Sequence, residues 1–341
     1  MARAPINFAV GVLVSRSILR WIKVERKSWI ALSAVAAGLA LLTSASFRKW
    51  KSQAERRLLS CSEVVHTACG PMEYASFGQG LDLLLVHGAL GGYDQGVAIA
   101  SLLGLSGVRF LAISRPGYLR TPLETGRTYE QQANALVALL DALQVPQAIV
   151  LGVSAGGPAS MLFAQNHPRR CAGLILLSAV TKRIPVAEVR LTPPLRLALS
   201  GVADFAGWLA LGLMHRSPKL MTKGMLSPPE RELLNDPRKR AAFLRVVDTF
   251  LPVAPRRIGI ENDRKQLDSL PEIPPQNIRT PALIVHGTAD RLVPYQHATA
   301  AAAAIPGARV VTFDGGHLAG TLHGPAVRSA VAGFVAGQRQ A

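Results

Sequence analysis

From about Glu63 onward the chain alternates short apolar runs, typical of buried strands, with longer runs in which apolar residues recur at helical spacing. Residues 129–143 show the helical spacing most clearly, and 155–166 and 325–336 follow it as well. The apolar runs expected to form strands are 81–86, 108–113, 147–153, 173–178, 282–285 and 309–313. This alternation predicts an α/β fold in which a mostly parallel sheet carries helices on both faces.

The alternation is interrupted between about residues 181 and 280. Helical segments separated by prolines, such as 194–214 and 237–250, replace the strands there. We expect a helical cap inserted after the strand that ends near Ser178. A set of packing helices that does not control access to a site is the alternative, and the sequence does not separate the two.

The N-terminal part contains a run without charged side chains at residues 28–47. As a helix rising about 1.5 Å per residue, this run would span the roughly 30 Å hydrocarbon core of a bilayer. Trp29 and Trp50 lie near its ends, and Lys and Arg flank both sides so evenly that orientation cannot be read from them. A cleaved signal peptide or an organelle-targeting peptide is the alternative, but the run begins late and lacks a convincing cleavage site. We therefore expect a retained single-pass membrane anchor.

The domain organisation expected from these patterns is a basic N-terminal segment, 1–57, followed by a globular domain, 58–341, with the predicted cap at 181–280. The 38 Lys and Arg against 21 Asp and Glu give a net charge of +17, which suits anionic lipid, nucleic acid or acidic substrates. No nucleic-acid-binding motif accompanies that charge, so we expect no nucleic-acid partner. The cysteines are odd in number and form no CxxC pair, so they predict neither a disulfide framework nor a metal site.

Candidate chemistry begins with residues 152–156, GVSAG, which match G-x-S-x-G directly after an apolar strand and before a helical run. A serine on such a tight strand-to-helix turn projects its hydroxyl, and small neighbours let the strand and the helix approach closely. We identify Ser154 as the candidate nucleophile. The helix N-terminus that follows places the amide of Ala155 beside a developing oxyanion.

A second small-residue loop, His87 to Gly92, follows the strand 81–86. We expect the backbone amide of Ala89 in this loop to pair with that of Ala155 as an oxyanion hole. The imidazole of His87 is interpreted as a structural group at the strand end.

Two further strand ends supply an acid and a base. Asp290 follows the strand 282–285, and a carboxylate there can accept the Nδ1 proton of a histidine. His317 follows the strand 309–313 and two glycines, which let the chain turn so that the imidazole can act as base and then as acid. His323 is the nearest rival for that role but lies further into the next segment. The order Ser154, Asp290, His317, each just past a strand, is the strongest argument for the set.

These residues resemble the α/β-hydrolase superfamily over roughly residues 65–334, apart from the middle segment. Residues 114–118, SRPGY, are similar to that family's turn after the next strand, where an acidic residue usually comes first; Ser114 in that place is expected to remove a charge near the sheet end. The resemblance implies a membrane-anchored serine hydrolase of carboxylic esters, esterase- or lipase-like, and the anchor and basic surface favour an apolar or lipid-like ester.

Other functions remain open on the same residues. The triad also suits thioester hydrolysis or acyl transfer, and the fold has been reused for ligand binding without catalysis. Because family members with an Asp nucleophile include epoxide hydrolases and dehalogenases, Ser154 argues against those two activities. No metal or organic cofactor is required by the expected chemistry. Acyl length, head group, membrane sidedness and oligomeric state are not encoded in the motifs.

Overall fold

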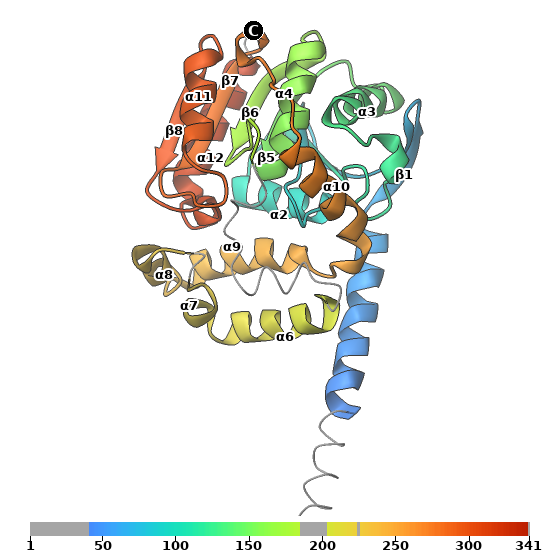
Figure 1. The fold of residues 1–341 in the computed structure, drawn as a ribbon, viewed down its shortest axis with the longest axis vertical. Helices are drawn as coiled ribbons and strands as arrows, with labels where there is room; N and C mark the ends of the chain where they lie inside the picture. The colour runs from blue at the N-terminus through green and yellow to red at the C-terminus, as the bar shows by residue number, and fades with distance from the viewer. Residues whose placement is uncertain (1–40, 185–202, 224–225, 340–341) are drawn as a thin grey trace, which may run out of the picture. The chain divides into compact units, whose positions relative to one another are not determined.

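The computed structural model describes residues 41–184, 203–223 and 226–339 (Figure 1). The chain divides into two compact units, residues 1–53 and 54–341. The predicted boundary at 57/58 lies four residues later, within a helical segment that covers residues 41–60. Most of the predicted membrane span, 28–40, lies outside the described residues. Within the described ranges, no helix has the length and apolar character needed to cross a bilayer.

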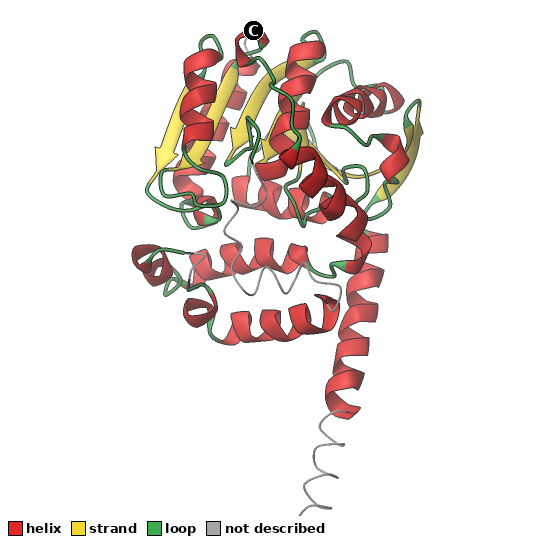
Figure 2. Ribbon diagram, in the orientation of Figure 1, coloured by secondary structure: helices red, strands yellow, loops and turns green. Residues whose placement is uncertain are grey.

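An eight-stranded sheet forms the centre of the second unit, in the order β1-β2-β4-β3-β5-β6-β7-β8 (Figure 2). Neighbouring strands from β4 to β8 in this order run parallel, and β2 pairs antiparallel with both β1 and β4. The strands are β1 Glu63–Thr67, β2 Gly70–Gly78, β3 Leu81–Val86, β4 Val108–Ile113, β5 Ala148–Val153, β6 Cys171–Leu177, β7 Ala282–Gly287 and β8 Arg309–Phe313. The predicted α/β class is confirmed, and the structure adds the β1–β2 hairpin to the six expected strands.

Helices cover both faces of the sheet (Figure 1). One face packs against α3 (Tyr129–Ala142), α4 (Gly157–Asn166) and α11 (Gln296–Ala304), and the other against α2 (Tyr93–Leu103) and α12 (Gly324–Gln338). Alternate residues of β3 divide between the two cores, with Leu84 and Val86 on the α3 side and Leu83 and Leu85 on the α2 side. A strand buried on both faces reads as a nearly continuous apolar run, and in 81–86 only Asp82 interrupts it.

Among the described residues, the regular secondary structure between β6 and β7 consists of helices joined by short loops, apart from one isolated bridge. We refer to α6–α9 as the cap helices; they are α6 Ala203–Arg216, α7 Pro218–Met221, α8 Pro228–Leu233 and α9 Pro237–Val247. They form a layer apart from the sheet (Figure 1) and share a hydrophobic cluster that also includes Leu322. Helix α10 (Arg257–Asp268) returns to the sheet layers, where Asp263 forms a buried ion pair with Arg115.

Candidate active site

The turn after β5 holds Ser154 in a left-handed backbone conformation, with φ of +49°. Small residues make this turn possible. A Cβ on Gly156 would come within 2.5 Å of the carbonyl oxygen of Val86, and one on Gly157 within 2.3 Å of that of Val180. The turn therefore presents the Ser154 side chain at the carboxyl edge of the sheet, as the motif predicts. The backbone of Ser154 is strained, and the surrounding packing must stabilise it.

Three side chains predicted from separate strand ends meet at this edge. His317 Nε2 lies 3.0 Å from Ser154 Oγ, and His317 Nδ1 lies 2.7 Å from Asp290 Oδ2. The His317 side chain is only 14% exposed and that of Asp290 is fully buried. With Nδ1 bonded to the carboxylate, Nε2 is left free to accept the Ser154 hydroxyl proton. The arrangement can remove a proton from Ser154 and stabilise the imidazolium that results.

Asp290 is fixed by more than His317. Its Oδ1 accepts hydrogen bonds of 2.9 Å from the backbone N–H groups of Leu292 and Val293, and His286 Nε2 lies 3.3 Å from Oδ2. Burial alone would raise the pKa of the Asp290 carboxyl, but the charge of His317 and the hydrogen bonds from His286, His317 and Val293 outweigh it and lower that pKa. Asp290 is therefore held as a carboxylate.

The loop that carries Ala89 runs beside the serine. A Cβ on Gly88 would come within 3.0 Å of Ser154 Cβ, so a side chain here would push against the serine. The loop is fixed by Gln95 of α2, whose Oε1 accepts a 3.0 Å hydrogen bond from Gly88 N. Ala155, the other expected amide donor, directly follows Ser154. The sequence contained no signal for Gln95, because its role depends on a hydrogen bond across the loop.

The other candidate histidines have structural contacts. His87 is buried, donates from Nδ1 to Gly88 O at 2.6 Å and accepts at Nε2 from Arg115 N at 2.9 Å. Burial, reinforced by the charge of Arg115, lowers its pKa well below the usual value, so His87 stays neutral, in agreement with its interpretation as a structural group. His323 stacks on Phe313, with ring centroids 5.4 Å apart, and is not the histidine bonded to Ser154.

The expectation that Ser114 removes a charge near the sheet end is wrong. Ser114 Oγ donates a 2.7 Å hydrogen bond to Glu73 Oε2, so β2 supplies a carboxylate beside the position where the family usually has its own. Glu73 is fully buried and is held by Arg120 Nε at 2.7 Å and Ser62 Oγ at 2.8 Å. Because these partners come from distant parts of the chain, no local pattern could have identified Glu73.

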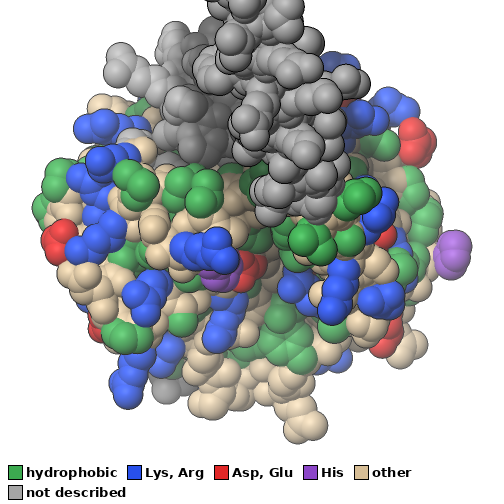
Figure 3. Space-filling view, turned by 90° about the horizontal axis from the view of Figure 1, so that it is seen from below, with side chains coloured by type: hydrophobic (Ala, Val, Ile, Leu, Met, Phe, Trp, Pro, Cys, Tyr) green, Lys and Arg blue, Asp and Glu red, His purple; other side chains and the backbone are tan. Residues whose placement is uncertain are grey.

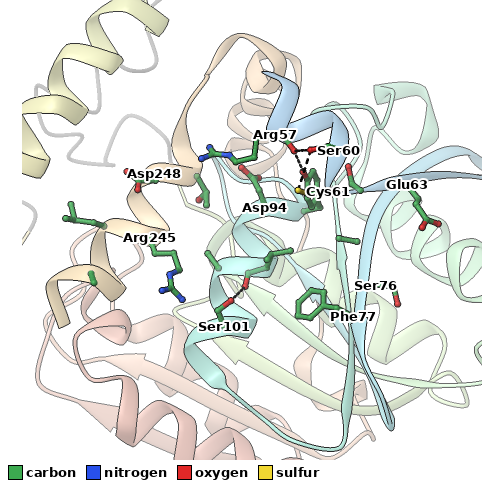
Figure 4. Close-up of a pocket in the computed structure, with 18 of the residues that line it drawn as sticks. Arg57, Ser60, Cys61, Glu63, Ser76, Phe77, Asp94, Ser101, Arg245 and Asp248 are labelled. Carbon is green, nitrogen blue, oxygen red and sulfur yellow. Dashed lines mark hydrogen bonds between the residues drawn. The ribbon is translucent and has the colours of Figure 1, made fainter. Parts of the chain in front are cut away.

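A groove of about 960 Å³ lies elsewhere in the second unit (Figure 4). It is lined by the segment that precedes β1, by β2, by the outer face of α2 and by α6, α9 and the turn after α9, and none of the three residues Ser154, Asp290 and His317 borders it. The groove and the serine are separate features. Among the described residues no group of His, Cys, Asp and Glu is arranged to hold a metal ion.

A doubly covered sheet with a serine, a histidine and a carboxylate at its carboxyl edge defines an α/β-hydrolase fold. The chain belongs to the alpha/beta hydrolase family, whose family model matches residues 83–330. It is similar to the uncharacterized hydrolase YcgS of Bacillus subtilis (strain 168), with 30% identity over 261 residues, covering 73% of this chain and 89% of YcgS.

Two further proteins are similar to the chain. A pimeloyl-acyl-carrier-protein methyl ester esterase of Aromatoleum aromaticum is 28% identical over 245 residues, covering 68% of this chain and 89% of the esterase. Among solved structures, an alpha/beta hydrolase fold protein from Nakamurella multipartita superposes with a TM-score of 0.71 at 32% identity, covering 80% of this chain and 97% of that one.

Proposed function

We propose that the chain is a serine hydrolase that cleaves carboxylic esters. The observation that carries the proposal is the unbroken line of hydrogen bonds from Ser154 through His317 to Asp290. Ser154 Oγ bonds to the acyl carbon while its proton passes to His317 Nε2. The imidazolium then gives that proton to the departing alkoxide, which leaves as an alcohol.

Water completes the cycle. His317 takes a proton from the water that attacks the acyl-enzyme, and collapse of the intermediate releases the carboxylic acid and restores Ser154. The amides of Ala89 and Ala155 are the proposed donors to the oxyanion in both steps. Their support is the position of the Gly88 loop against Ser154 and of Ala155 at the first turn after it.

An apolar or lipid-like ester is the proposed substrate class. Exposed leucines on the cap helices support it, since Leu209, Leu213 and Leu220 are between 44% and 60% exposed. Hydrophobic side chains lie among Lys and Arg on the face seen in Figure 3, a mixture that suits an anionic, amphiphilic surface. The predicted anchor at 28–47 belongs to the same proposal, because it would keep the enzyme at a bilayer that supplies such esters.

The test is labelling of the full-length chain by a fluorophosphonate probe, with the modified peptide identified by mass spectrometry. We expect one labelled residue, Ser154, and no labelling of Ser154→Ala. Labelling of a folded protein at another residue, or ester turnover that survives Ser154→Ala, would overturn the proposal. Matched ester and thioester substrates of increasing acyl length then test the substrate class, with faster ester turnover and a preference for longer chains expected.

A further inference from the structure

Glu230, in the first turn of cap helix α8, contacts the segment that carries His317. Its Oε1 accepts a 2.7 Å hydrogen bond from the backbone N–H of Gly316, the residue immediately before the histidine. The glutamate is 3% exposed and Gly316 is buried, so water does not compete for this bond. A cap residue is thus bonded to the main chain one residue from the imidazole that contacts Ser154.

The second carboxylate oxygen of Glu230 is also engaged by backbone. Oε2 accepts a 2.6 Å hydrogen bond from Ser227 N, and the Ser227 hydroxyl accepts from Glu230 N, which together form a capping box at the start of α8. Within the described ranges no Lys, Arg or His lies within ion-pair distance of Glu230. A buried carboxylate without a cation is costly, and here two N–H groups and the helix N-terminus must stabilise it. The Ser227 side chain alone would cap the start of α8, so helix capping does not by itself require a buried glutamate at position 230.

Hydrophobic packing joins the same two parts. We define the histidine loop as residues 314–323, between β8 and α12. Leu322 of this loop is 1% exposed and belongs to the hydrophobic cluster of the cap helices, together with Met214 and Phe243, and Leu318 packs against that cluster. The loop therefore takes part of its core from the cap and does not rest on the sheet alone.

The opposite side of the histidine loop is bonded to the turn that carries Asp290. Ala289 N donates a 3.0 Å hydrogen bond to Gly315 O, and Thr288 N donates one of 3.0 Å to Phe313 O. Gly315 and Gly316 thus connect to the acid's turn on one side and to Glu230 on the other. Two flexible glycines precede the histidine, so backbone freedom at this point must be removed by such external bonds.

We infer that Glu230 is a positioning residue, through which the cap helices hold His317 in reach of Ser154. The inference rests on the proposed function and deepens it: the cap helices hold the base of the proposed triad in place. One consequence is that substrate must enter without α8 leaving the histidine loop, since a movement that breaks the Glu230–Gly316 bond also releases the base.

The experiment compares Glu230→Gln and Glu230→Ala with two controls in the full-length chain. The first control, Ser227→Ala, weakens the same helix N-terminus but leaves the Gly316 bond in place. The second, Glu232→Gln, removes the same charge two residues further along α8, at an exposed site where the partner is Lys219. Four quantities are measured for each variant: kcat and KM on a short soluble ester, the rate of fluorophosphonate labelling, and the downfield proton resonance of the Asp290–His317 hydrogen bond.

For Glu230→Ala we expect kcat and the labelling rate to fall roughly 10- to 100-fold, since a displacement of about 1 Å at a reacting group can cost 10²-fold. KM should change little, and the downfield resonance should broaden or vanish. The kcat of Glu230→Gln should lie between those of Glu230→Ala and the wild type. The single carbonyl oxygen of glutamine can accept a hydrogen bond from Gly316 N or from Ser227 N, but not from both in the present geometry. Ser227→Ala and Glu232→Gln should keep wild-type kcat and the resonance.

Wild-type kcat and labelling in Glu230→Ala would overturn the inference, as would an equal loss in Ser227→Ala, which would make the effect one of helix stability. If Glu230→Ala does not fold, Glu230→Gln decides: an unchanged melting temperature with reduced kcat supports the role, and unchanged kcat contradicts it. If the wild type is not labelled at all, the proposed function fails, while the downfield resonance still shows whether Glu230 holds His317 against Asp290.

Discussion

At the scale of single residues, the turn around Ser154 depends on positions that have no room for a side chain. Gly156 lies where a Cβ would meet two carbonyl oxygens, at 2.5 Å from Val86 and 2.7 Å from His87. Backbone atoms cannot move aside as the end of a flexible side chain can. The neighbours of Ser154 must therefore be small because there is no space for a side chain, and their close packing holds the strained φ of Ser154.

A pair of glycine substitutions tests this. We expect Gly156→Ala to lower the free energy of unfolding by about 1–3 kcal/mol through overpacking and to reduce ester turnover. Gly333→Ala is the matched control: it lies in the interior of α12 with nothing within 4 Å of the added Cβ, and we expect it to stabilise the protein by about 0.5–1 kcal/mol. Urea denaturation measures both. Equal effects of the two substitutions would contradict the close approach at the turn.

His297 gives the stability a dependence on pH. Burial, reinforced by the charge of Lys182, lowers its pKa to about 4, whereas in the unfolded chain it titrates near its ordinary value of about 6.5. Between these values the unfolded state binds a proton that the folded state does not, so the free energy of unfolding falls as pH falls, by at most about 1.4 kcal/mol per pH unit for this group. His87, whose pKa is also lowered, acts in the same direction.

The check is urea denaturation of wild type and His297→Gln between about pH 7 and about pH 5. We expect the variant to be less stable at neutral pH, because it loses the bond to Thr181 N, but to have a shallower slope with pH. The lowered pKa of Asp290 adds separately to the free energy of unfolding. This contribution is lost only when the pH falls below about 3.9, the ordinary pKa of an aspartate. Identical slopes in the two proteins would exclude His297 as a source of the dependence.

At the scale of elements, one buried ion pair joins α10 to the sheet layers. Asp263 of α10 binds Arg115 in the turn after β4, with Arg115 Nη1 2.9 Å from Oδ1, and it also accepts from Tyr118 Oη at 2.6 Å. Both charged side chains are almost fully buried. Loss of either partner leaves the other charge without compensation in a medium of low polarity.

Asp263→Asn tests that contact. We expect the free energy of unfolding to fall by about 3–5 kcal/mol, because a buried guanidinium loses its counter-charge. Asp82→Asn is the control, since its partner Arg109 is 38% exposed and an ion pair near solvent contributes about 1 kcal/mol or less. Denaturant midpoints of the two variants measure the difference. Comparable midpoints would show that α10 is held by its other contacts.

The strands illustrate which elements a pattern can reveal. Runs such as 81–86 and 108–113 were predicted with the observed bounds, because central parallel strands are apolar on both faces. The pattern does not predict the hairpin of β1 and β2. β1 is largely exposed at the sheet edge, and the middle of β2 contains the buried Glu73, so neither shows a continuous apolar run.

At the scale of the whole molecule, the junction between the two units is close to residue 54. Leu58 and Ala54 are 6% and 5% exposed, and Leu58 packs in the cluster beneath α2, where Tyr93 Oη donates a 3.0 Å hydrogen bond to its carbonyl oxygen. The helical residues 54–60 therefore belong to the second unit. A cut at the predicted boundary, 57/58, would pass through this packed segment.

Two truncations test the junction. We expect a chain of residues 54–341 to hydrolyse a short soluble ester as the full chain does. A chain of residues 62–341 should be about 2–3 kcal/mol less stable, because the burial of Leu58 is lost. Flotation with vesicles containing anionic lipid tests the anchor in the same samples, with the full chain bound and residues 54–341 released. Equal binding by both would contradict an anchor in residues 1–53.

The sequence by itself determined the fold class and the three side chains that meet at the sheet edge. Both follow from local signals: apolar periodicity marks the strands, and chain order places the residues after them at one edge. Only the tertiary structure decided the carboxylate beside Ser114, the engagement of Gly316 by Glu230 and the junction near Ala54. Each depends on bonds or packing between residues that are far apart in the sequence. Tyr93 and Leu58 are 35 positions apart, and Gly316 and Glu230 are 86 positions apart. A polar side chain can be buried only where it finds hydrogen-bond partners. Here those partners come from distant parts of the chain, so the local sequence around each residue does not reveal them.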